Sequence, residues 1–548
     1  MTAADDARAW LAVDPDPETR AEVEDLLRAD DRAGLEARFG ERLTFGTAGL
    51  RGAIGAGPNR MNRVVVQQTS AGLAAFLRGR ADRPTAVVGW DGRRNSRVFA
   101  EDAAAVLVAA GVEAVLLPRA LPTPVLAFAV RELGADAGVM ITASHNPADD
   151  NGYKLYLGGP DAGSQLVAPS DAAVLAEIEA VVATGALPPR AESVPQAPES
   201  VVQRYVAATA AVAAADGGLP WVYTPLHGVG LETVRAVLAE AGLPTPQVVA
   251  EQAEPDGAFP TAPFPNPEEP GTLDLAFALA RDTGARLVLA NDPDADRLAV
   301  AVPDGSSPEG WRRLTGNDVG LLLGWRTAQA ASAAGGTLAC SVVSTPGLAR
   351  IARRFGFLHV ETLTGFKWIS RAPALLFGFE EALGYLVDPD VVRDKDGISA
   401  LVAVLAAAVE LDRDGRGLAD LLAEVEEAIG RFDSAQISLR VQDLREIDRL
   451  MARLRAEPPR EIGGLPVEAV DDLSAGVDLP PTDALRYRLR GGARVIVRPS
   501  GTEPKLKVYV DVVSDARTAA ERRTRTDDAL AALRAGVDGL LRGPEEPR

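Results

Sequence analysis

Cysteine, histidine and lysine are scarce in this 548-residue chain, and no long hydrophobic run is present. The single cysteine, Cys340, excludes an intramolecular disulfide, and its apolar surroundings indicate a buried, inert thiol. No apolar stretch approaches the ~20 residues needed to cross a bilayer, and the first residues lack the pattern of an export signal. We therefore expect a cytoplasmic protein without a membrane span.

Basic residues are fewer than acidic ones, 57 against 77, and the formal net charge is therefore −20. Such a chain repels nucleic acid and acidic membranes, so neither is expected as a partner. A small phosphorylated ligand stays compatible, since it needs only local positive charge in a cleft. The apolar and charged fractions, 47% and 24%, are typical of globular proteins, and the length predicts several domains.

Arginine supplies most of the basic residues. Of the 57 basic residues, five are lysines: Lys154, Lys367, Lys395, Lys505 and Lys507. They fall in four short segments that are unusual in other ways. A lysine can shift its pKa and exchange a proton, which a guanidinium cannot readily do. A coding bias toward arginine is the plain alternative, so the clustering only supports a functional role.

Alternating strand and helix patterns predict three tandem α/β modules, followed by a smaller α+β C-terminal domain. The modules cover residues 85–142, 221–290 and 337–411, and the pattern changes near Arg431. A linker rich in Pro, Ala and Glu, Ala186–Ser200, marks the first boundary. No close sequence repeat is visible, so any duplication is expected to be structural. The predicted domains are residues 1–195, 196–312, 313–430 and 431–548.

A candidate nucleophile, Ser144, follows the predicted strand Ala137–Thr142 in the sequence Ala-Ser-His-Asn-Pro. Open α/β sheets usually place ligands at the carboxyl ends of their strands. Taken alone, the pentapeptide slightly favours an ordinary polar turn closed by Asn-Pro. His145 is able to orient or protonate nearby groups.

A candidate metal site follows another predicted strand, in Asp292-Pro-Asp-Ala-Asp-Arg297. Carboxylates at alternate positions can direct three oxygens at one hard cation, and magnesium is the natural candidate. A calcium EF-hand is excluded because its sixth and twelfth positions need glycine and glutamate, whereas Arg297 and Pro303 stand there. A phosphorylated Ser144 can complete the metal shell.

Two later segments are suited to a phosphorylated sugar. In Gly378-Phe-Glu-Glu-Ala-Leu-Gly-Tyr385, Glu380 or Glu381 can accept hydrogen bonds from vicinal hydroxyls, and Thr364-Gly365-Phe366-Lys367 offers a second lining. In the segment from Arg498 to Val508, a Ser-Gly-Thr turn between Arg498 and Lys507 can hold phosphate oxygens. A plain hairpin explains that turn but not its flanking cations.

The glycine-rich segment Gly46–Gly52 lacks the pattern of a nucleotide-binding loop. Its Arg51 can still reach a phosphate.

Taken together and in this order, TASHNP, DPDADR, GFEEALGY and RPSGTEP closely resemble the motifs of the α-D-phosphohexomutase superfamily. The stretches FGTAGLRG, YTPLHGVG and FPNPEEPGTLDLA are most similar to its phosphoglucomutase and phosphopentomutase branch. The resemblance implies three related α/β domains and a fourth domain around a central cleft. It also implies Mg²⁺ as cofactor and glucose 1,6-bisphosphate as activator.

The resemblance assigns roles position by position. Ser144 becomes the phosphoserine and, with Asp292, Asp294 and Asp296, a metal ligand. The residues that it implies in catalysis are Ser144, His145, Lys154, Arg51, Arg297 and Lys395. The residues that it implies in substrate binding are Thr364, Gly365, Lys367, Glu380, Arg393, Arg498, Ser500, Gly501, Thr502 and Lys507. One departure concerns substrate choice: Ala382 stands where phosphoglucomutases commonly carry serine.

The implied activity is a phosphohexomutase acting on glucose phosphate, with mannose phosphate as a further substrate. Phosphoserine donates its phosphoryl group to one sugar hydroxyl, the bisphosphate turns over, and the other phosphate returns to Ser144. A phosphopentomutase or a glucose 1,6-bisphosphate synthase is the alternative within the superfamily. Other classes are a sugar phosphatase and a silent sugar-phosphate sensor, but the phosphate-binding turn argues against the first and the complete set of motifs against the second.

Overall fold

The computed structural model describes residues 2–44, 49–331, 335–441, 443–476, 479–500 and 505–542. The chain divides into two compact units. The first comprises Met1–Leu314 and Gly384–Gly415, and the second Thr315–Leu383 and Arg416–Arg548. Among the described helices, none has the length and apolar character needed to span a membrane.

The first unit opens with three short helices: α1 (Ala3–Trp10), α2 (Pro17–Arg28) and α3 (Arg32–Phe39). Each begins after a side chain that accepts a hydrogen bond from a first-turn backbone N–H, a role filled by Thr2, Asp16 and Asp31. Helices α1 and α3 pack through Trp10 and Phe39, whose ring centroids are 5.8 Å apart at a steep angle.

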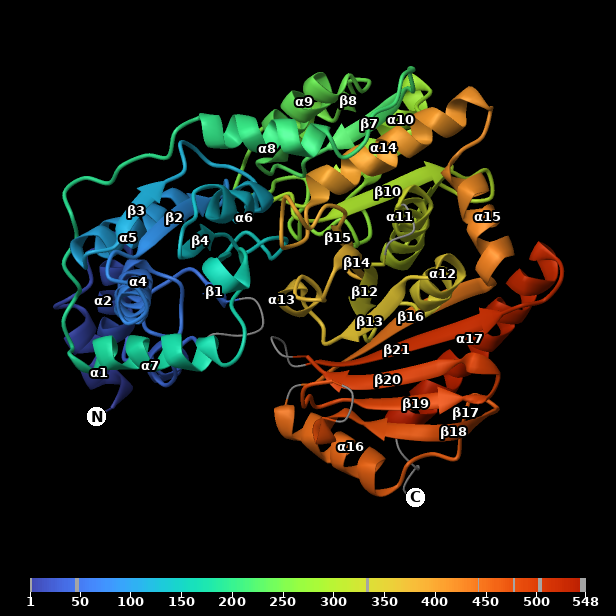
Figure 1. Cartoon of the computed structure of the whole chain (residues 1–548). Coiled ribbons are helices and arrows are strands. Elements are labelled where there is room, and N and C mark those ends of the chain that lie inside the picture. Colours follow the sequence, from blue (N-terminus) through green and yellow to red (C-terminus); the bar gives the residue numbers. More distant parts are fainter. Residues whose placement is uncertain are drawn as a thin grey trace. The chain divides into compact units, whose positions relative to one another are not determined.

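The first α/β module follows. Its elements are β1 (Leu50–Ala53), α4 (Arg63–Arg78), β2 (Thr85–Trp90), α5 (Ser96–Ala109), β3 (Glu113–Leu116), α6 (Thr123–Glu132), β4 (Ala137–Ile141), β5 (Asp150–Leu157), β6 (Ser164–Gln165) and α7 (Ser170–Ala183). The sheet order is β1-β5-β4-β2-β3 (Figure 1). Strands β2, β3 and β4 are parallel, whereas β5 runs antiparallel to β4. All five residues of β4 are buried, as helices on both faces of a sheet require.

The second module has a closely similar plan. Its elements are α8 (Ser200–Ala210), β7 (Trp221–Thr224), α9 (Gly230–Ala241), β8 (Gln247–Val248), α10 (Asp274–Thr283), β9 (Leu287–Asn291), β10 (Leu298–Pro303) and β11 (Trp311–Arg313). The order is β11-β10-β9-β7-β8, with β7, β8 and β9 parallel and β10 antiparallel to β9.

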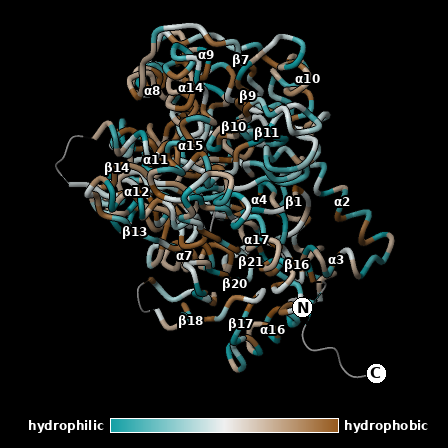
Figure 2. The backbone as a smooth tube through the Cα atoms, turned by 90° about the vertical axis from the view of Figure 1, so that its right-hand side faces the viewer, coloured by the Kyte–Doolittle hydropathy of each residue, from teal (hydrophilic) through white to brown (hydrophobic). Residues whose placement is uncertain are grey.

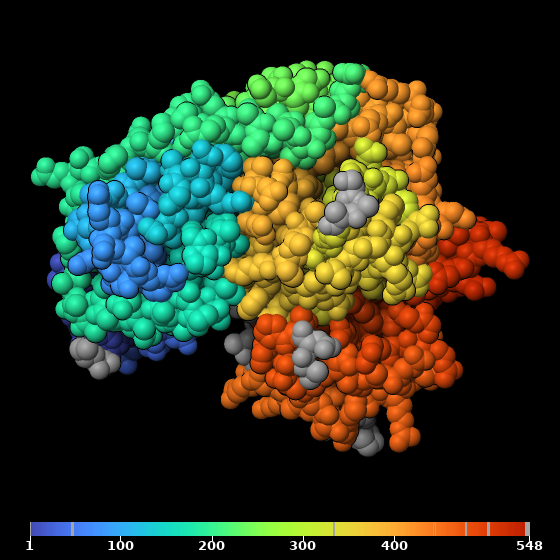
Figure 3. Space-filling view, viewed as in Figure 1, coloured from blue at the N-terminus to red at the C-terminus, as the bar shows by residue number. Residues whose placement is uncertain are grey.

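A helix from later in the chain completes this second module. Helix α14 (Gly397–Arg413) follows the short strand β15 (Gly384–Leu386) and packs against β9, β10 and α8 (Figure 1). Figure 2 colours much of α14 brown, in keeping with its many buried apolar residues. In the space-filling view, orange atoms from this part of the chain abut green atoms of the second module (Figure 3).

The second unit holds the third module and the C-terminal domain. The module contains α11 (Gly316–Ala330), β12 (Thr337–Ser341), α12 (Gly347–Phe355), β13 (Leu358–Thr362), α13 (Phe366–Ile369), β14 (Leu375–Glu380) and α15 (Leu418–Ile429). Strand β12 lies between β13 and β14 and is parallel to both.

The C-terminal domain is a single antiparallel sheet with two helices. Its elements are β16 (Arg431–Arg440), α16 (Leu444–Ala456), β17 (Glu461–Ile462), β18 (Leu465–Asp472), β19 (Leu485–Leu489), β20 (Arg494–Pro499), β21 (Lys505–Ser514) and α17 (Ala519–Arg542). The order is β16-β21-β20-β19-β18-β17. Apolar residues of α16, α17 and the sheet form a core of their own.

The three modules share one strand order although their sequences show no close repeat. In each, the first strand lies between the second and third, giving β3-β2-β4, β8-β7-β9 and β13-β12-β14. The segments with Ser144, the aspartates and Glu380 occur where the third strand ends. Ligands usually bind at the carboxyl ends of the strands in parallel α/β sheets. The candidate site segments of the three modules therefore occupy the same topological position. The predicted three related α/β domains plus an α+β domain are confirmed.

Candidate active site

Ser144 lies in a tight turn between β4 and β5. Its φ of 54° places it in the left-handed region, and its side chain is almost fully buried. The backbone N–H of Ser144 donates to Thr142 Oγ1 at 2.8 Å, and Thr142 in turn donates to Asp91 Oδ2 at 2.6 Å. The turn is therefore tied back to the end of the neighbouring strand β2.

One buried guanidinium holds the backbone of this serine turn. Arg93 donates to the carbonyl oxygens of Ser144 and Asn146 at 2.6 Å each, of Pro147 at 2.8 Å and of Asp150 at 3.2 Å. It also lies 3.5 Å from Asp91 and packs over the ring of Phe259, with the guanidinium carbon 4.9 Å from the ring centroid. A guanidinium carries five N–H donors in one plane and can therefore bind several carbonyl oxygens at once.

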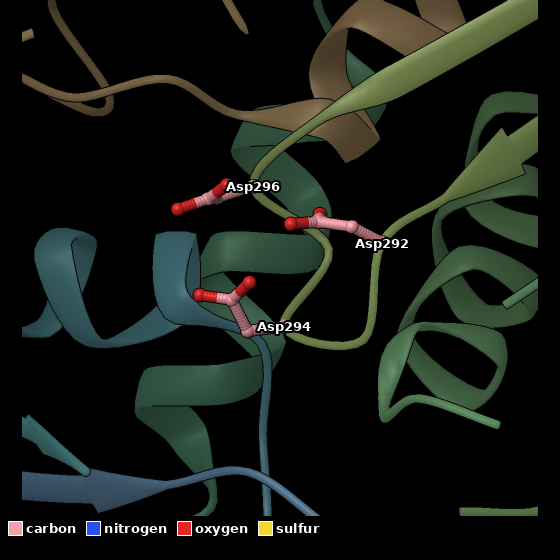
Figure 4. Close-up of side chains that lie close together, drawn as sticks. All are labelled: Asp292, Asp294 and Asp296. Carbon is pink, nitrogen blue, oxygen red and sulfur yellow. The ribbon is translucent and has the colours of Figure 1, made fainter. Parts of the chain in front are cut away.

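The three aspartates after β9 converge as the sequence predicts. Asp292, Asp294 and Asp296 are fully buried, and one oxygen from each lies within 4.8 Å of the others. Their carboxylates surround a common space (Figure 4). Ala295 at a φ of 55° turns the loop, and the backbone N–H of Arg297 donates to Asp292 Oδ1 at 3.0 Å.

Cations surround this triad. Lys154 Nζ donates to Oδ2 of Asp294 at 2.7 Å and to Oδ2 of Asp296 at 2.8 Å. Lys395 Nζ is 3.0 Å from Asp296 Oδ2, and Arg297 Nε is 3.9 Å from Oδ1 of the same aspartate. The predicted catalytic residues Lys154, Arg297 and Lys395 are thus brought together on one carboxylate.

The three carboxyls differ in acidity because their neighbours differ. Burial opposes the ionisation of Asp296, but Lys154, Lys395 and Arg297 outweigh it and lower its pKa. Burial and Asp296 also oppose the ionisation of Asp294, yet Lys154 and Thr123 lower its pKa. For Asp292, burial and the charges of the other two aspartates prevail and raise the pKa well above its ordinary value.

A direct hydrogen bond joins the serine turn to the aspartate triad. Ser144 Oγ donates to Asp292 Oδ2 at 2.8 Å, and His145 Nδ1 lies 3.1 Å from the same Oγ. Arg51, on β1, donates to Asn146 Oδ1 at 3.1 Å and so borders the turn. Burial, Arg297 and Arg51 lower the pKa of His145 well below its ordinary value, so the imidazole is neutral at pH 7.

The donor set fits a hard cation. Oδ1 of Asp294 and Oδ1 of Asp296 are buried, and neither has a hydrogen-bond partner among the described residues. Such an oxygen costs free energy unless a ligand meets it. Oxygen donors of this kind, with a serine oxygen beside them, suit Mg²⁺ better than softer metals.

Further contacts hold the loops that supply these residues. Thr123, at the start of α6, donates from Oγ1 to Asp294 Oδ2 at 2.5 Å. This hydrogen bond links the first module to the aspartate loop of the second module. Asp394, next to Lys395, accepts hydrogen bonds from Tyr156 at 2.8 Å and Gln165 at 2.7 Å.

The substrate-binding residues predicted in the second unit form separate clusters. Arg498 on β20 donates to Thr364 Oγ1 at 2.6 Å and pairs across the sheet with Lys507 on β21. The backbone N–H of Ser500 donates to the carbonyl of Lys505 at 2.8 Å, as expected for a hairpin. Gly501 and Thr502 lie outside the described residues.

The remaining predicted residues border the ends of short elements. Gly365 has a φ of 104° and precedes Lys367, a buried residue of α13. Arg393 belongs to the first unit.

The carboxylate of Glu381 has a structural role. Its Oε2 accepts hydrogen bonds from the hydroxyls of Ser341 and Ser344 at 3.1 Å each.

Sequence reasoning missed Arg93, Asp91 and Thr123. A signal was present for the first two, because Asp91-Gly-Arg93 follows β2 just as Ser144 follows β4. For Thr123, which opens a helix, no comparable signal exists.

Three α/β modules with one strand order and a buried serine hydrogen-bonded to an aspartate triad are the features expected of the phospho-sugar mutases. Family models bear this out. The phosphoglucomutase/phosphomannomutase α/β/α domains I, II and III match residues 42–183, 203–305 and 315–428, and the C-terminal domain of that family matches residues 437–529.

Individual relatives agree with the family models. A Haemophilus influenzae protein named probable phosphomannomutase is 49% identical, over 88% of this chain and 98% of its own length. Human phosphopentomutase is 35% identical, over 92% of this chain and 90% of its own length. A Staphylococcus aureus phosphoglucomutase is 33% identical, over 88% of this chain and 92% of its own length. The solved structure of Paramecium parafusin, a phosphoglucomutase, shares the fold with a TM-score of 0.70 at 18% identity, covering 92% of this chain and 97% of that one.

The chain belongs to the phosphoglucomutase/phosphomannomutase family of the α-D-phosphohexomutase superfamily. It is an enzyme of the mutase type, a phosphotransferase that acts as an isomerase.

Proposed function

We propose that the enzyme interconverts the 1- and 6-phosphates of glucose, and also of mannose, through a phosphoserine at Ser144 and a bisphosphorylated sugar. The observation that supports this most strongly is the buried hydrogen bond of 2.8 Å between Ser144 Oγ and Asp292. It supports the proposal because Ser144 Oγ lies beside a cluster of oxygens suited to a divalent cation. A merely structural serine has no need of such a neighbour.

Asp292, Asp294 and Asp296, with an oxygen of the modified Ser144, would hold Mg²⁺. When bound, this ion withdraws electron density from the phosphoryl group and offsets its charge. Lys154 and Lys395 keep the carboxylates in place, since their ammonium groups contact Asp296 at 2.8 and 3.0 Å. We assign Arg51 and Arg297 to stabilising charge on the transferring group.

In the forward step, the bond between phosphorus and Ser144 Oγ breaks and a bond to a sugar hydroxyl oxygen forms. The hydroxyl loses its proton, and Ser144 Oγ regains one. His145, whose Nδ1 is 3.1 Å from that Oγ, is our candidate for the group that exchanges a proton there. Lys395 is the further candidate on the sugar side. Glucose 1,6-bisphosphate would serve as the activator that first phosphorylates Ser144.

We assign sugar and distal phosphate recognition to the second unit. Glu380 would accept hydrogen bonds from sugar hydroxyls, with Thr364, Gly365 and Lys367 as further lining, and Arg393 of the first unit would add a cation. Arg498, Ser500, Gly501, Thr502 and Lys507 would hold the distal phosphate. The pairing of Arg498 with Lys507 supports this, because two adjacent cations suit a dianion.

A pentose substrate is the second candidate, favoured by the likeness to human phosphopentomutase and by Ala382 in the sugar loop. Turnover of glucose 1-phosphate, mannose 1-phosphate and ribose 1-phosphate should be compared with the wild type and Ser144→Ala. We expect the two hexose phosphates to be preferred and the variant to be inactive. Faster turnover of ribose 1-phosphate would overturn the hexose assignment, and phosphate release without isomer would overturn the mutase assignment.

A further inference from the structure

A second cleft, remote in sequence from Ser144 and the aspartates, lies in the second unit where α15 joins β16. It has a volume of about 670 Å³. Its walls come from α12, the end of α15 and the connection between β21 and α17. Gly430 is the only residue between α15 and β16, and its φ is 84°. Such a positive φ favours glycine at this position.

The cleft is rich in arginine. It is lined by five arginines and three acids: Arg350, Arg353, Arg354, Arg517, Arg522, Glu426, Glu427 and Asp515. Two arginines account for all three acids. Arg350 binds both oxygens of Asp515, and Arg522 donates to Glu426 at 2.9 Å and Glu427 at 2.8 Å.

Three arginines are left over. Within the described residues, Arg353, Arg354 and Arg517 have no acidic partner, although Arg354 packs over the ring of Trp325, 6.0 Å from its centroid. The five arginines and three acids leave an excess of two positive charges on one cleft, which is unexpected in a chain with a net charge of −20. The mutual repulsion of these groups costs free energy that an anion would offset.

Ordinary helix electrostatics explains only part of this surplus. Arg353 and Arg354 lie in the last turn of α12, where cations interact favourably with the helix dipole. Arg517 lies two residues before α17 begins at Ala519, at the positive end of that helix, where a cation is unfavourable. The helix dipole therefore does not account for the charge of Arg517.

We propose that this cleft binds a small phosphate-bearing dianion between Arg353 and Arg354 on one side and Arg517 on the other. Guanidinium groups recognise phosphate oxygens through paired hydrogen bonds, and the volume admits a phosphate monoester as large as a phosphosugar. The bound anion bridges α12 to the β21–α17 connection across Gly430. It thereby strengthens the attachment of the C-terminal domain to the third module. This inference does not depend on which sugar the enzyme converts.

The test is equilibrium dialysis with ³²P-labelled inorganic phosphate at low ionic strength. The wild type is compared with Arg353→Ser/Arg517→Ser and with the matched control Arg449→Ser/Arg534→Ser, which removes two exposed arginines of the second unit outside the cleft. We expect the cleft variant to bind one phosphate fewer per chain, or to bind it at least about tenfold more weakly, while the control matches the wild type. Identical binding by all three proteins overturns the proposal.

Two further measurements keep the result decisive. Should the double variant fail to fold, Arg517→Ser alone is tested by the phosphate-dependent rise in melting temperature, which should shrink relative to wild type. An unchanged rise contradicts the proposal. Unlabelled glucose 6-phosphate then distinguishes the natural source of the anion. Release of the cleft phosphate indicates a phosphosugar, and retention indicates free phosphate.

Discussion

The turn that contains Ser144, the serine turn, and the turn from Asp292 to Arg297, which we name the metal turn after its proposed ligand, occupy the same position in their modules. Different interactions hold the two turns. Each follows the third strand and contains one left-handed residue, Ser144 at a φ of 54° and Ala295 at 55°. The serine turn is held through its backbone, by four carbonyl oxygens that all bond to Arg93. The metal turn is held through its side chains, by ion pairs to Lys154 and Lys395.

The difference matches what the proposed mechanism requires of each turn. A serine that is phosphorylated gains a charge of about −1.5 to −2, so an anchor to neutral carbonyls leaves its position independent of its charge state. In the proposed mechanism, the aspartates would instead share a space with a cation. Ion pairs lower the pKa values of two of them, Asp294 and Asp296, in spite of complete burial.

The largest effect should come from breaking the side-chain anchor with Asp296→Ala. This change removes the carboxylate that Lys154, Lys395 and Arg297 share, and leaves three cations around the metal position. We expect Mn²⁺ affinity, measured by electron paramagnetic resonance, to fall by more than about 100-fold. Asp282→Ala, at an exposed position on α10, is the control. Affinity within a few-fold of wild type would contradict the metal assignment.

Breaking the backbone anchor should affect the serine and spare the metal. Arg93→Lys keeps the charge but loses the planar fork, so the four carbonyls cannot all be satisfied. We expect phosphorylation of Ser144, followed by intact-protein mass, to slow by about 10- to 100-fold with little change in Mn²⁺ affinity. Arg94→Lys, at the exposed neighbouring position, should behave as wild type. Equal losses in both properties would show that the two turns are not held independently.

A smaller effect is expected at the contact that joins the two modules. Thr123→Val removes the hydroxyl that donates to Asp294 Oδ2 while preserving the size of the side chain. Loss of a group that orients a metal ligand should weaken Mn²⁺ binding about tenfold. The phosphorylation rate at saturating metal should change little. No change in Mn²⁺ affinity would remove Thr123 from the metal site.

The smallest effect concerns the segment that carries Lys395. Burial raises the pKa of Asp396, which caps α14, to about 6. Because the folded state binds the proton more tightly than the unfolded state, ionisation of this carboxyl disfavours folding above pH 6, and the penalty disappears as the pH falls through 6 toward 4. Its upper limit is about 3 kcal/mol.

Asp396→Asn removes this penalty and keeps an oxygen for the backbone N–H groups of Ile398 and Ser399. We expect its melting temperature to exceed that of the wild type at pH 7.5, and the difference to shrink by pH 5. Calorimetric scans at the two pH values provide the measurement. A difference that does not depend on pH would show that Asp396 ionises normally.

Most of the α/β pattern could be predicted from hydrophobic periodicity. The strands Thr85–Trp90 and Ala137–Ile141 and the helices between them lie where the sequence indicated, because long apolar runs bounded by turn residues have few alternatives. Strand β5 was not predicted. It is buried on almost every residue, so it shows no alternation, and it begins with Asp-Asn-Gly, which is typical of turns. Yet β5 carries Lys154 to the aspartates.

The helical character of α14 was likewise predictable, but its packing against β9 and β10 was not. An apolar helix needs a partner surface to bury its side chains, and the sequence does not indicate which sheet supplies that surface.

In the site, the aspartates were predictable from their spacing alone. The four-carbonyl anchor at Arg93 was not, because backbone acceptors leave no trace in a sequence. The domain boundaries 195/196, 312/313 and 430/431 and the catalytic roles remain predictions.

The decisive measurement is the intact mass of the purified protein after incubation with Mg²⁺ and glucose 1,6-bisphosphate, for the wild type and for Ser144→Ala. We predict that the wild type gains one phosphoryl group and loses it when a sugar monophosphate is added, and that the variant gains none. An unmodified wild type, or equal modification of both proteins, would contradict a mutase that works through Ser144.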